Sequence, residues 1–472
     1  MYKRLLPFAL CVLFCSSLIA RGTELKPRLV VLTDIAPANI EPDDMESMVR
    51  LMVHADLFEI EAIIATTGYN NSNYPPSWMD SLVTTVNSYE KDLPNLMKRS
   101  DQKKFVSFKS ENDKQYIGYW PSPDYLRSRM VLGSLKMGIK FIGADNDSEG
   151  SNLIIKLADE EDERPLWITV WGGGNTLAQA VWRVQQDRSP EEFKKFLHKL
   201  RVYTITDQDK PWERVQSAFG VSAHQWLRRD FSKDLMFIWD ECAWLLHNSL
   251  GSSSWQNYSE QIQGHGKLGS VYPKYKWGVE GDTPSYLHIL PNGLNDPNDS
   301  KQAGWGGYSE FGIGNDNSTY CYTNWAGEAK KISDEYFKYF FPAIFNNFAA
   351  RMDWAAYGRG NRNPIVIVNG SKGFEAINIE TSSNSVVSLD ASKSEDPEDN
   401  NLKYKWWIQP EAGDLAEGVL INDFVIENEN SAIVKLEVPK SASKSIIHII
   451  CELSDDGEPS LTSYRRLIVT VK

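Results

Sequence analysis

The pattern of apolar and polar residues over the first two-thirds of the chain alternates between two periods. Short apolar runs rich in β-branched residues, which are typical of buried strands, occupy residues 29–32, 60–66, 166–171, 200–206 and 235–239. From Asp43 to Val53, in contrast, apolar side chains recur at the spacing of one helix face. A strand, a helix and a second strand in succession form a βαβ unit. We therefore expect an α/β domain built on a mainly parallel sheet.

The pattern changes after residue 363. Residues 357–363 have the composition of a linker. Short alternating segments follow at 364–368, 385–389, 402–408, 432–438, 446–453 and 464–471. This spacing predicts a small all-β, immunoglobulin-like sandwich of about one hundred residues. We thus expect two domains, at residues 25–358 and 364–472.

Three short motifs in the second region carry a resemblance. Leu389-Asp390-Ala391-Ser392, Asp396-Pro397 and Lys403-Tyr404-Lys405-Trp406 resemble sequences of polycystic-kidney-disease and cadherin-like domains. The resemblance implies that Trp406 is a core residue and that Trp407 lies on the opposite face of its strand.

Residues 1–22 have the composition of a signal peptide. Lys3 and Arg4 precede an apolar stretch from Leu5 to Ala20, and small residues at 20–22 offer a cleavage site. The stretch is too short and too interrupted for stable membrane insertion. We expect a secreted protein, periplasmic or extracellular.

The composition of the chain limits the classes of molecule that it is expected to bind. The chain has 472 residues and a formal net charge of −13, which argues against nucleic acid as a partner. Its 16 Trp and 20 Tyr suit sugar stacking, but they equally suit cores and interfaces, so a homo-oligomer remains open. Cys242, Cys321 and Cys451 are too widely spaced for a disulfide framework or a zinc site.

Three aspartates converge where the first strand ends and the first helix begins. Asp34 follows the strand, and Asp43 and Asp44 open the helix. Ligand sites of open α/β sheets lie at this edge. Carboxylates this close repel one another unless a hard cation or a polyhydroxyl ligand lies between them. Helix capping by Asp43 or Asp44 is the alternative, but it leaves Asp34 unexplained.

Polar residues follow other strands at the same predicted edge. Asn70 and Asn71 follow the second strand, and Asp207, Gln208 and Asp209 follow the fourth. Both groups suit simple turns, and the resemblance to nucleoside hydrolases given below implies that they are candidates for substrate contact. The third strand runs into Gly172-Gly173-Gly174-Asn175, and these glycines allow close approach of the backbone to a ligand.

The region from residue 264 to 307 supplies further candidates. Residues 264–278 are glycine-rich without periodicity, which predicts a long ordered loop over the site. Asp282 stands immediately before Thr283-Pro284, where the proline suits the first turn of a helix. Trp305, between glycines, is expected as an exposed ring on a loop on the substrate side.

Together these motifs resemble those of nucleoside hydrolases, and most closely the secreted two-domain nucleoside hydrolase-like proteins often labelled cellulose-binding. The resemblance implies a doubly wound α/β fold with a calcium ion held by Asp34, Asp44, Asp282 and the main-chain carbonyl of Asn175. It also implies that Asp34 takes the proton of the attacking water and that Asp43 holds a sugar hydroxyl.

The chain departs from the family pattern at two places. Residues 35–42 form a longer loop than the tight turn of nucleoside hydrolases. Gly281 also stands where some branches have a histidine acid directly before the last metal aspartate. Glu280 is the nearest replacement, since a carboxyl kept neutral by burial can donate a proton. His265 and His288 are fallback donors.

These features imply a hydrolase that cleaves an N- or O-glycosidic bond of a nucleoside or small saccharide with a calcium-activated water. The alternative is a carbohydrate-binding protein of the cellulose-binding type that keeps the fold without turnover. The longer loop and the missing histidine favour the alternative, whereas the complete set of metal-type aspartates favours the enzyme.

Overall fold

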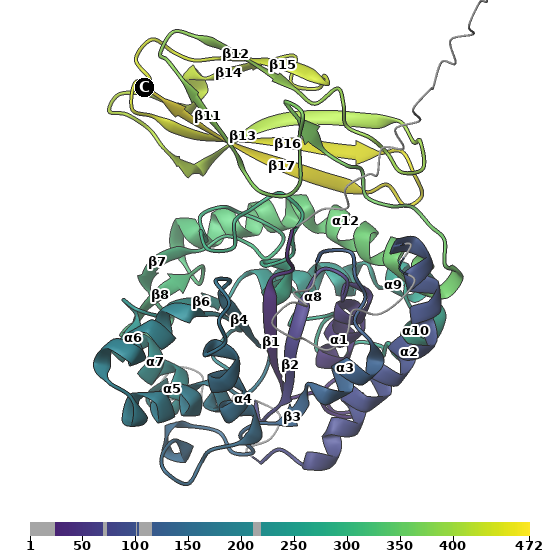
Figure 1. Cartoon of the computed structure of the whole chain (residues 1–472), viewed down its shortest axis with the longest axis vertical. Coiled ribbons are helices and arrows are strands. Elements are labelled where there is room, and N and C mark those ends of the chain that lie inside the picture. The colour runs from purple at the N-terminus through teal and green to yellow at the C-terminus, as the bar shows by residue number, and fades with distance from the viewer. Residues whose placement is uncertain (1–23, 69–72, 101, 103–115, 211–218) are drawn as a thin grey trace, which may run out of the picture.

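The computed structural model describes residues 24–68, 73–100, 102, 116–210 and 219–472 (Figure 1). Asn70, Asn71 and residues 1–22 lie outside the described residues, so the expectations for them stay expectations. In the described part of the chain, no helix is both long and apolar enough to cross a membrane.

The first domain is built on one eight-stranded sheet in the order β3-β2-β1-β4-β5-β6-β8-β7. Its strands are β1 Arg28–Thr33, β2 Glu59–Ala65, β3 Met130–Leu132, β4 Leu166–Val170, β5 Leu200–Ile205, β6 Met236–Asp240, β7 Glu310–Ile313 and β8 Tyr320–Thr323. Neighbouring strands are parallel except β7 and β8, which form an antiparallel edge pair. The mainly parallel sheet is confirmed, and all five strands expected in this domain are present.

Helices cover both faces of this sheet. They are α1 Asp43–Val53, α2 Asp80–Ser100, α3 Pro123–Ser128, α4 Glu149–Ala158, α5 Asn175–Asp187, α6 Pro190–Lys199, α7 Ala223–Phe231, α8 Ala243–Ser253, α9 Trp255–Gln261, α10 Gly266–Val271, α11 Thr283–Leu287 and α12 Gly327–Tyr357. Leu29 and Val31 of β1 pack into one hydrophobic core, and Val30 and Leu32 pack into the other. Because both faces of the strand are buried, its sequence is a continuous apolar run.

The strand order changes direction between β1 and β4. From β1 the sheet grows to β2 and β3 on one side, and from β4 it grows to β5 and β6 on the other. Apolar residues of α1 join the first core and those of α5 join the second, so the two following helices leave toward opposite faces. Such a switch point opens a crevice at the carboxyl ends of the two strands. Thr33 and Val170 end at this place.

The glycine-rich segment differs from the expectation. Residues 266–271 form α10 rather than a loop. The carboxylate of Asp92 on α2 accepts hydrogen bonds from the backbone N–H groups of Lys267 (2.8 Å) and Leu268 (2.7 Å). A carboxylate at a helix N-terminus stabilises the first turn, and a local sequence pattern does not show a cap that comes from another helix.

The second region is the expected β-sandwich. One sheet has the order β11-β17-β16-β13 and the other β12-β15-β14, with a short β9-β10 pair beside them. The strands are β9 Ile367–Val368, β10 Ser371–Lys372, β11 Ile377–Thr381, β12 Val386–Asp390, β13 Leu402–Asp414, β14 Val425–Glu427, β15 Ile433–Glu437, β16 Ile446–Asp455 and β17 Thr462–Val471. Trp406 is buried in its core, as expected. The exact limits of the two domains stay a prediction.

Helix α12 lies between the sheet and the sandwich (Figure 1). Trp407, on the face of β13 opposite to Trp406, stacks on Tyr336 of α12 with ring centroids 6.0 Å apart. Tyr464 of β17 packs against Phe340 of α12 (5.9 Å). Through these aromatic contacts the sandwich packs against α12 of the first domain.

Candidate functional site

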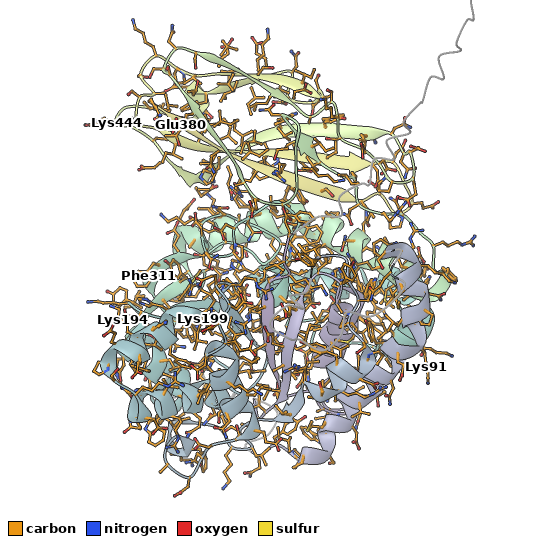
Figure 2. The ribbon with its side chains drawn as sticks, viewed as in Figure 1. Lys91, Lys194, Lys199, Phe311, Glu380 and Lys444 are labelled. Atoms are coloured by element: carbon orange, nitrogen blue, oxygen red, sulfur yellow. The ribbon has the colours of Figure 1, made fainter. Side chains whose placement is uncertain are left out.

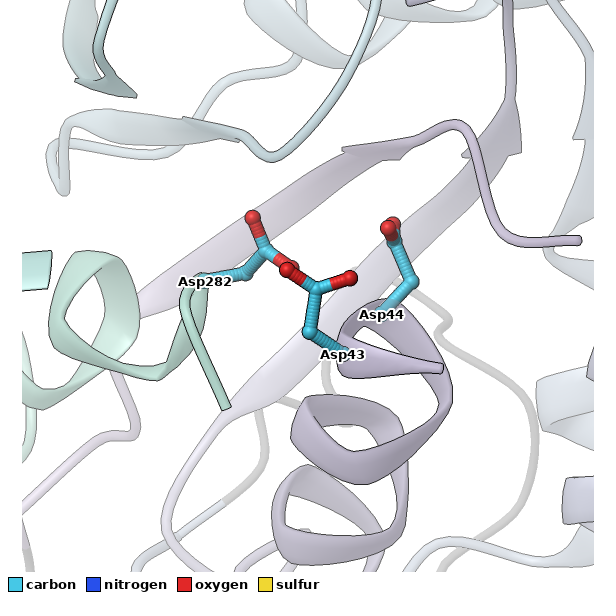
Figure 3. A group of neighbouring side chains, drawn as sticks. All are labelled: Asp43, Asp44 and Asp282. Atoms are coloured by element: carbon cyan, nitrogen blue, oxygen red, sulfur yellow. The ribbon is translucent and has the colours of Figure 1, made fainter. Parts of the chain in front are cut away.

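Three buried or half-buried carboxylates meet beside the switch point. Asp43 and Asp44 come from the start of α1, and Asp282 directly precedes α11 (Figure 3). One oxygen from each lies within 4.8 Å of the other two. Oδ1 of Asp43 and Oδ2 of Asp282 are buried, and neither has a hydrogen-bond partner among the described residues. Unpaired hard oxygen donors in such a group fit a divalent cation of the calcium type.

Asp34 lies at the carboxyl end of β1, between two glycines. A Cβ on Gly68 would stand 2.3 Å from Oδ2 of Asp34, and one on Gly172 would stand 2.1 Å from Oδ1. The first of the three glycines after β4 therefore makes room for this carboxylate. The charge of Asp34 also acts on Asp44 and Asp282, so the structure brings Asp34, Asp43, Asp44 and Asp282 together.

The electrostatics of the group are those of crowded anions. Burial, together with the charges of Asp34 and Asp43, raises the pKa of Asp44 well above its ordinary value, although a hydrogen bond from Thr33 Oγ1 opposes this. Burial and the charges of Asp44, Asp43 and Asp34 likewise raise the pKa of Asp282. Such a site without a counter-ion holds protons, and a bound cation would replace them.

Two further glutamates face this group and were missed from the sequence. Burial and the neighbouring charge of Asp43 raise the pKa of Glu41 to about 12. Glu46 lies one helical turn after Asp43, and burial followed by the Asp43 charge raises its pKa well above the ordinary value. The sequence did contain an indication for each of these two glutamates. Glu41 stands two residues before Asp43 in the long loop, and Glu46 has the i+3 spacing of a shared helix face.

Glu280 does not have the environment expected of a proton donor. It is completely buried, forms an ion pair with Nε of Arg50 (2.6 Å) and lies 3.0 Å from Nε2 of His247. The hydroxyl of Tyr272 donates to its other oxygen (2.7 Å). Burial alone would raise its pKa, but Arg50 and His247 hold the pKa of Glu280 below its ordinary value. An ionised carboxylate has no proton to give, so this environment argues against the expected acid role.

The three polar residues after β5 are occupied by structural contacts. Asp207 forms an ion pair with Arg228 (3.0 Å), and the side chain of Gln208 donates to the carbonyl of Ile205 (3.0 Å). Asp209 accepts from the backbone N–H of Gly138 (2.9 Å). Only the bond of Gln208 is local, as in a turn, whereas Asp207 and Asp209 join segments distant in sequence. Substrate contact by these three residues stays a prediction.

Asn175 is the first residue of α5. Its side chain binds the backbone of Gly138, the residue that Asp209 also contacts. Its Oδ1 accepts from the N–H of Gly138 (2.7 Å), and its Nδ2 donates to the carbonyl of that residue (2.8 Å). The side chain is thus engaged in structure. The expected role concerns the main-chain carbonyl of Asn175, and it stays an expectation.

Trp305 was expected as an exposed ring, and this is wrong. Its side chain is 1% exposed and packs edge-on against Tyr464 of the sandwich, with ring centroids 6.3 Å apart. The covering surface comes from residues more than 150 positions away, which a local pattern does not reveal.

The fallback histidines are also engaged outside the carboxylate group. His288 is buried with its Nε2 2.9 Å from the carbonyl of Pro297, and burial lowers its pKa to about 4. His265 lies 3.5 Å from Asp353 of α12.

Two family models match the chain. One, described as cellulose-binding Sde182, nucleoside hydrolase-like domain, matches residues 28–308. The other, described as cellulose-binding protein Sde0182, C-terminal domain, matches residues 386–471. A search of the curated proteins finds no match.

Among solved structures, the chain is similar to a nucleoside hydrolase-related hypothetical protein from Saccharophagus degradans that is associated with carbohydrate metabolism. The identity is 34%, the TM-score is 0.78, and the match covers 95% of this chain and 100% of that one. A PKD domain of the KIAA 1837 protein matches at 22% identity and a TM-score of 0.16, over 22% of this chain and 92% of its own. The chain therefore belongs to the family of cellulose-binding Sde182 proteins with a nucleoside hydrolase-like domain.

Proposed function

We propose that this chain is a secreted hydrolase that cleaves an N- or O-glycosidic bond of a nucleoside or small glycoside with Ca²⁺ as its cofactor. The observation that carries the proposal is the group of Asp43, Asp44 and Asp282, whose oxygens converge within 4.8 Å. This group lies beside the switch point of the sheet, and ligands bind at the switch point in such folds.

The ligands of the cation would be Asp34, Asp44, Asp282 and the carbonyl of Asn175, with water and sugar hydroxyls completing the six to eight oxygens that calcium takes. A bound cation would compensate the buried negative charge and make a coordinated water more acidic. The raised pKa values of Asp44 and Asp282 support a cation at this place.

Asp34 and Asp43 have distinct roles in the proposed reaction. Asp34 accepts a proton from the water that attacks the anomeric carbon, while the C–N or C–O bond breaks and its electron pair goes to the leaving group. Asp43 accepts a hydrogen bond from a sugar hydroxyl. The negative charge of the whole group stabilises the positive charge that develops on the sugar.

None of the three donors expected from the sequence has an environment suited to protonating the leaving group, so the proposed reaction assigns this proton to no side chain. Glu280 is held ionised in its pair with Arg50, and His265 and His288 have partners elsewhere. This arrangement favours substrates whose leaving groups depart without a strong acid. It also favours the second candidate function, a carbohydrate-binding protein without turnover.

The test is a hydrolysis screen over nucleosides and small plant-type glycosides, with added calcium and with a chelator. Asp44→Asn should abolish calcium-dependent turnover, whereas Asp399→Asn, an exposed aspartate of the sandwich, should leave it unchanged. Saccharide binding without turnover would select the carbohydrate-binding function. Turnover that survives both chelation and Asp44→Asn would contradict the proposed metal site.

A further inference from the structure

Trp277 is an exposed indole close in sequence to the carboxylate group. Its side chain is 65% exposed, the highest value of any aromatic residue in the described part of the chain. It stands five positions before Asp282, on the segment that connects α10 to α11. An exposed indole offers a flat apolar face on which a sugar ring can stack.

Lys276 links this ring to the loop that precedes α1. Its ammonium group lies 4.6 Å from the centroid of the Trp277 ring and donates to the carbonyls of Asn39 (3.2 Å) and Ile40 (3.5 Å). The next residue in that loop is Glu41, which is buried against Asp43. The indole is therefore held beside the long loop that leads into the carboxylate group.

The backbone that follows Trp277 leads from this loop to the carboxylate group. Gly278 lies so close to Asn248 of α8 that a Cβ there would stand 2.4 Å from the Asn248 Cβ. A Cβ on Gly281 would stand 3.1 Å from Oδ2 of Asp43 and 3.2 Å from Oδ1 of Asn248. Oδ2 of Asp43 and the side-chain amide of Asn248 thus both lie against the backbone of Gly281, which has no side chain to separate them.

Asn248 has an unsatisfied polar atom at this place. The residue is 8% exposed, and its Oδ1 is buried without a hydrogen-bond partner among the described residues. A buried amide oxygen left without a donor is costly. A hydroxyl group of a ligand, entering beside Asp43, would supply the missing donor.

We propose that Trp277 and Asn248 form a saccharide subsite at the carboxylate group. The part of the glycoside next to the bond that is cleaved places a hydroxyl on Oδ1 of Asn248, and the outer part stacks its apolar ring face on Trp277. The inference rests on the proposed function, because Asp43 is taken to bind the same ligand. The crowded carboxylates exclude anionic ligands such as phosphorylated sugars.

The test uses calorimetric titration of the full chain with cellobiose, methyl β-glucoside and inosine in calcium-containing buffer. Cellobiose adds a second flat pyranose ring that can reach the indole. Trp277→Ala should weaken cellobiose binding about tenfold, within the range of aromatic stacking, and should remove its advantage over methyl β-glucoside. Trp277→Phe should restore most of the affinity. Because Trp277 is exposed, these variants should fold like the wild type.

The matched control is Phe311→Ala. Phe311 is also an exposed ring (51%), but it lies on edge strand β7 at the outer surface of the domain (Figure 2). Its removal should leave cellobiose binding unchanged. Asn248→Ala should weaken binding of methyl β-glucoside, which reaches only the inner part of the subsite.

Other outcomes overturn the subsite. Equal cellobiose affinity of wild type and Trp277→Ala would do so while leaving the proposed hydrolase intact. Trp277-dependent binding of inosine without binding of cellobiose would assign the ring to a nucleobase instead of a sugar. A wild type that hydrolyses glycosides but binds no probe would also exclude the subsite. If the wild type neither binds nor hydrolyses any probe, both the subsite and the proposed function fail.

Discussion

Arg50 and Glu280 form a fully buried ion pair, 2.6 Å from Nε to Oε2, beneath the carboxylate group. Arg50 comes from α1 and Glu280 from the segment before α11, so the pair joins the two elements that supply Asp43, Asp44 and Asp282. The backbone N–H of Glu280 also donates to Glu46 (2.7 Å), which strengthens the same junction. This pair therefore positions the site.

Glu280→Gln should lower the free energy of unfolding by about 3–5 kcal/mol, because it leaves the Arg50 charge buried without its partner. Glu417→Gln, at an exposed position of the sandwich, should have almost no effect. Denaturant unfolding measures both. If Glu280 were the acid, its replacement would slow substrates with poor leaving groups and spare nitrophenyl glycosides. We expect both substrate types to respond alike.

The turn after β4 gives a second prediction. Gly172→Ala places a methyl group against the Asp34 carboxylate, 2.1 Å from Oδ1 in the present backbone. Displacing Asp34 should weaken calcium binding by about tenfold or more, in the range seen when groups that orient metal ligands are removed. Calcium titration followed by calorimetry checks this.

Gly220→Ala is the matched control, since a Cβ at Gly220 has no atom within 4 Å. It should bind calcium like the wild type. Unchanged calcium affinity in Gly172→Ala would remove Asp34 from the metal site.

The sequence pattern predicted the central strands well because they are buried on both faces. A continuous apolar run such as 166–171 that is followed by glycines is clearly assigned as a buried strand. The edge pair β7 and β8 was missed, since its outward side chains, Phe311 and Tyr320 among them, are exposed and its strands are short. Edge strands lack the two-sided burial that gives a clear signal.

The candidate site divides in a similar way. Asp34, Asp43, Asp44 and Asp282 could be found because strand ends and helix starts are visible in the pattern. Whether a carboxylate is paired with a cation is decided by residues distant in sequence. Glu280 meets Arg50, some 230 positions earlier, and this contact reverses the environment expected for it.

The contact between the domains gives a third prediction. Trp305→Ala removes a buried ring that packs against Tyr464, and it should cost about 3–5 kcal/mol of stability, as for other buried aromatic residues. Trp277→Ala removes the same side chain from an exposed position and should cost less than about 0.5 kcal/mol. Equal melting temperatures of the two variants would contradict a sandwich packed on the first domain.

The last prediction concerns the pH dependence of stability in metal-free protein. Burial and mutual repulsion raise the pKa values of Asp44, Glu46 and Asp282 well above ordinary values. In the unfolded chain these groups titrate near pH 4. Above that pH the folded protein therefore binds more protons than the unfolded chain, and its free energy of unfolding should fall as pH rises toward the raised pKa values.

Calcium should remove the part of this dependence that comes from Asp44 and Asp282, because it binds their deprotonated carboxylates and releases their protons. The rise in melting temperature on adding calcium should thus be larger at about pH 8 than at about pH 5. Thermal unfolding scans with calcium and with a chelator at both pH values measure this rise in melting temperature.

Asp44→Asn removes one titrating group and one ligand, so its metal-free protein should lose less stability with rising pH and gain little from calcium. Asp399→Asn should behave like the wild type. A calcium effect that is equal at the two pH values, or larger at the lower one, would show that these carboxylates do not bind the ion.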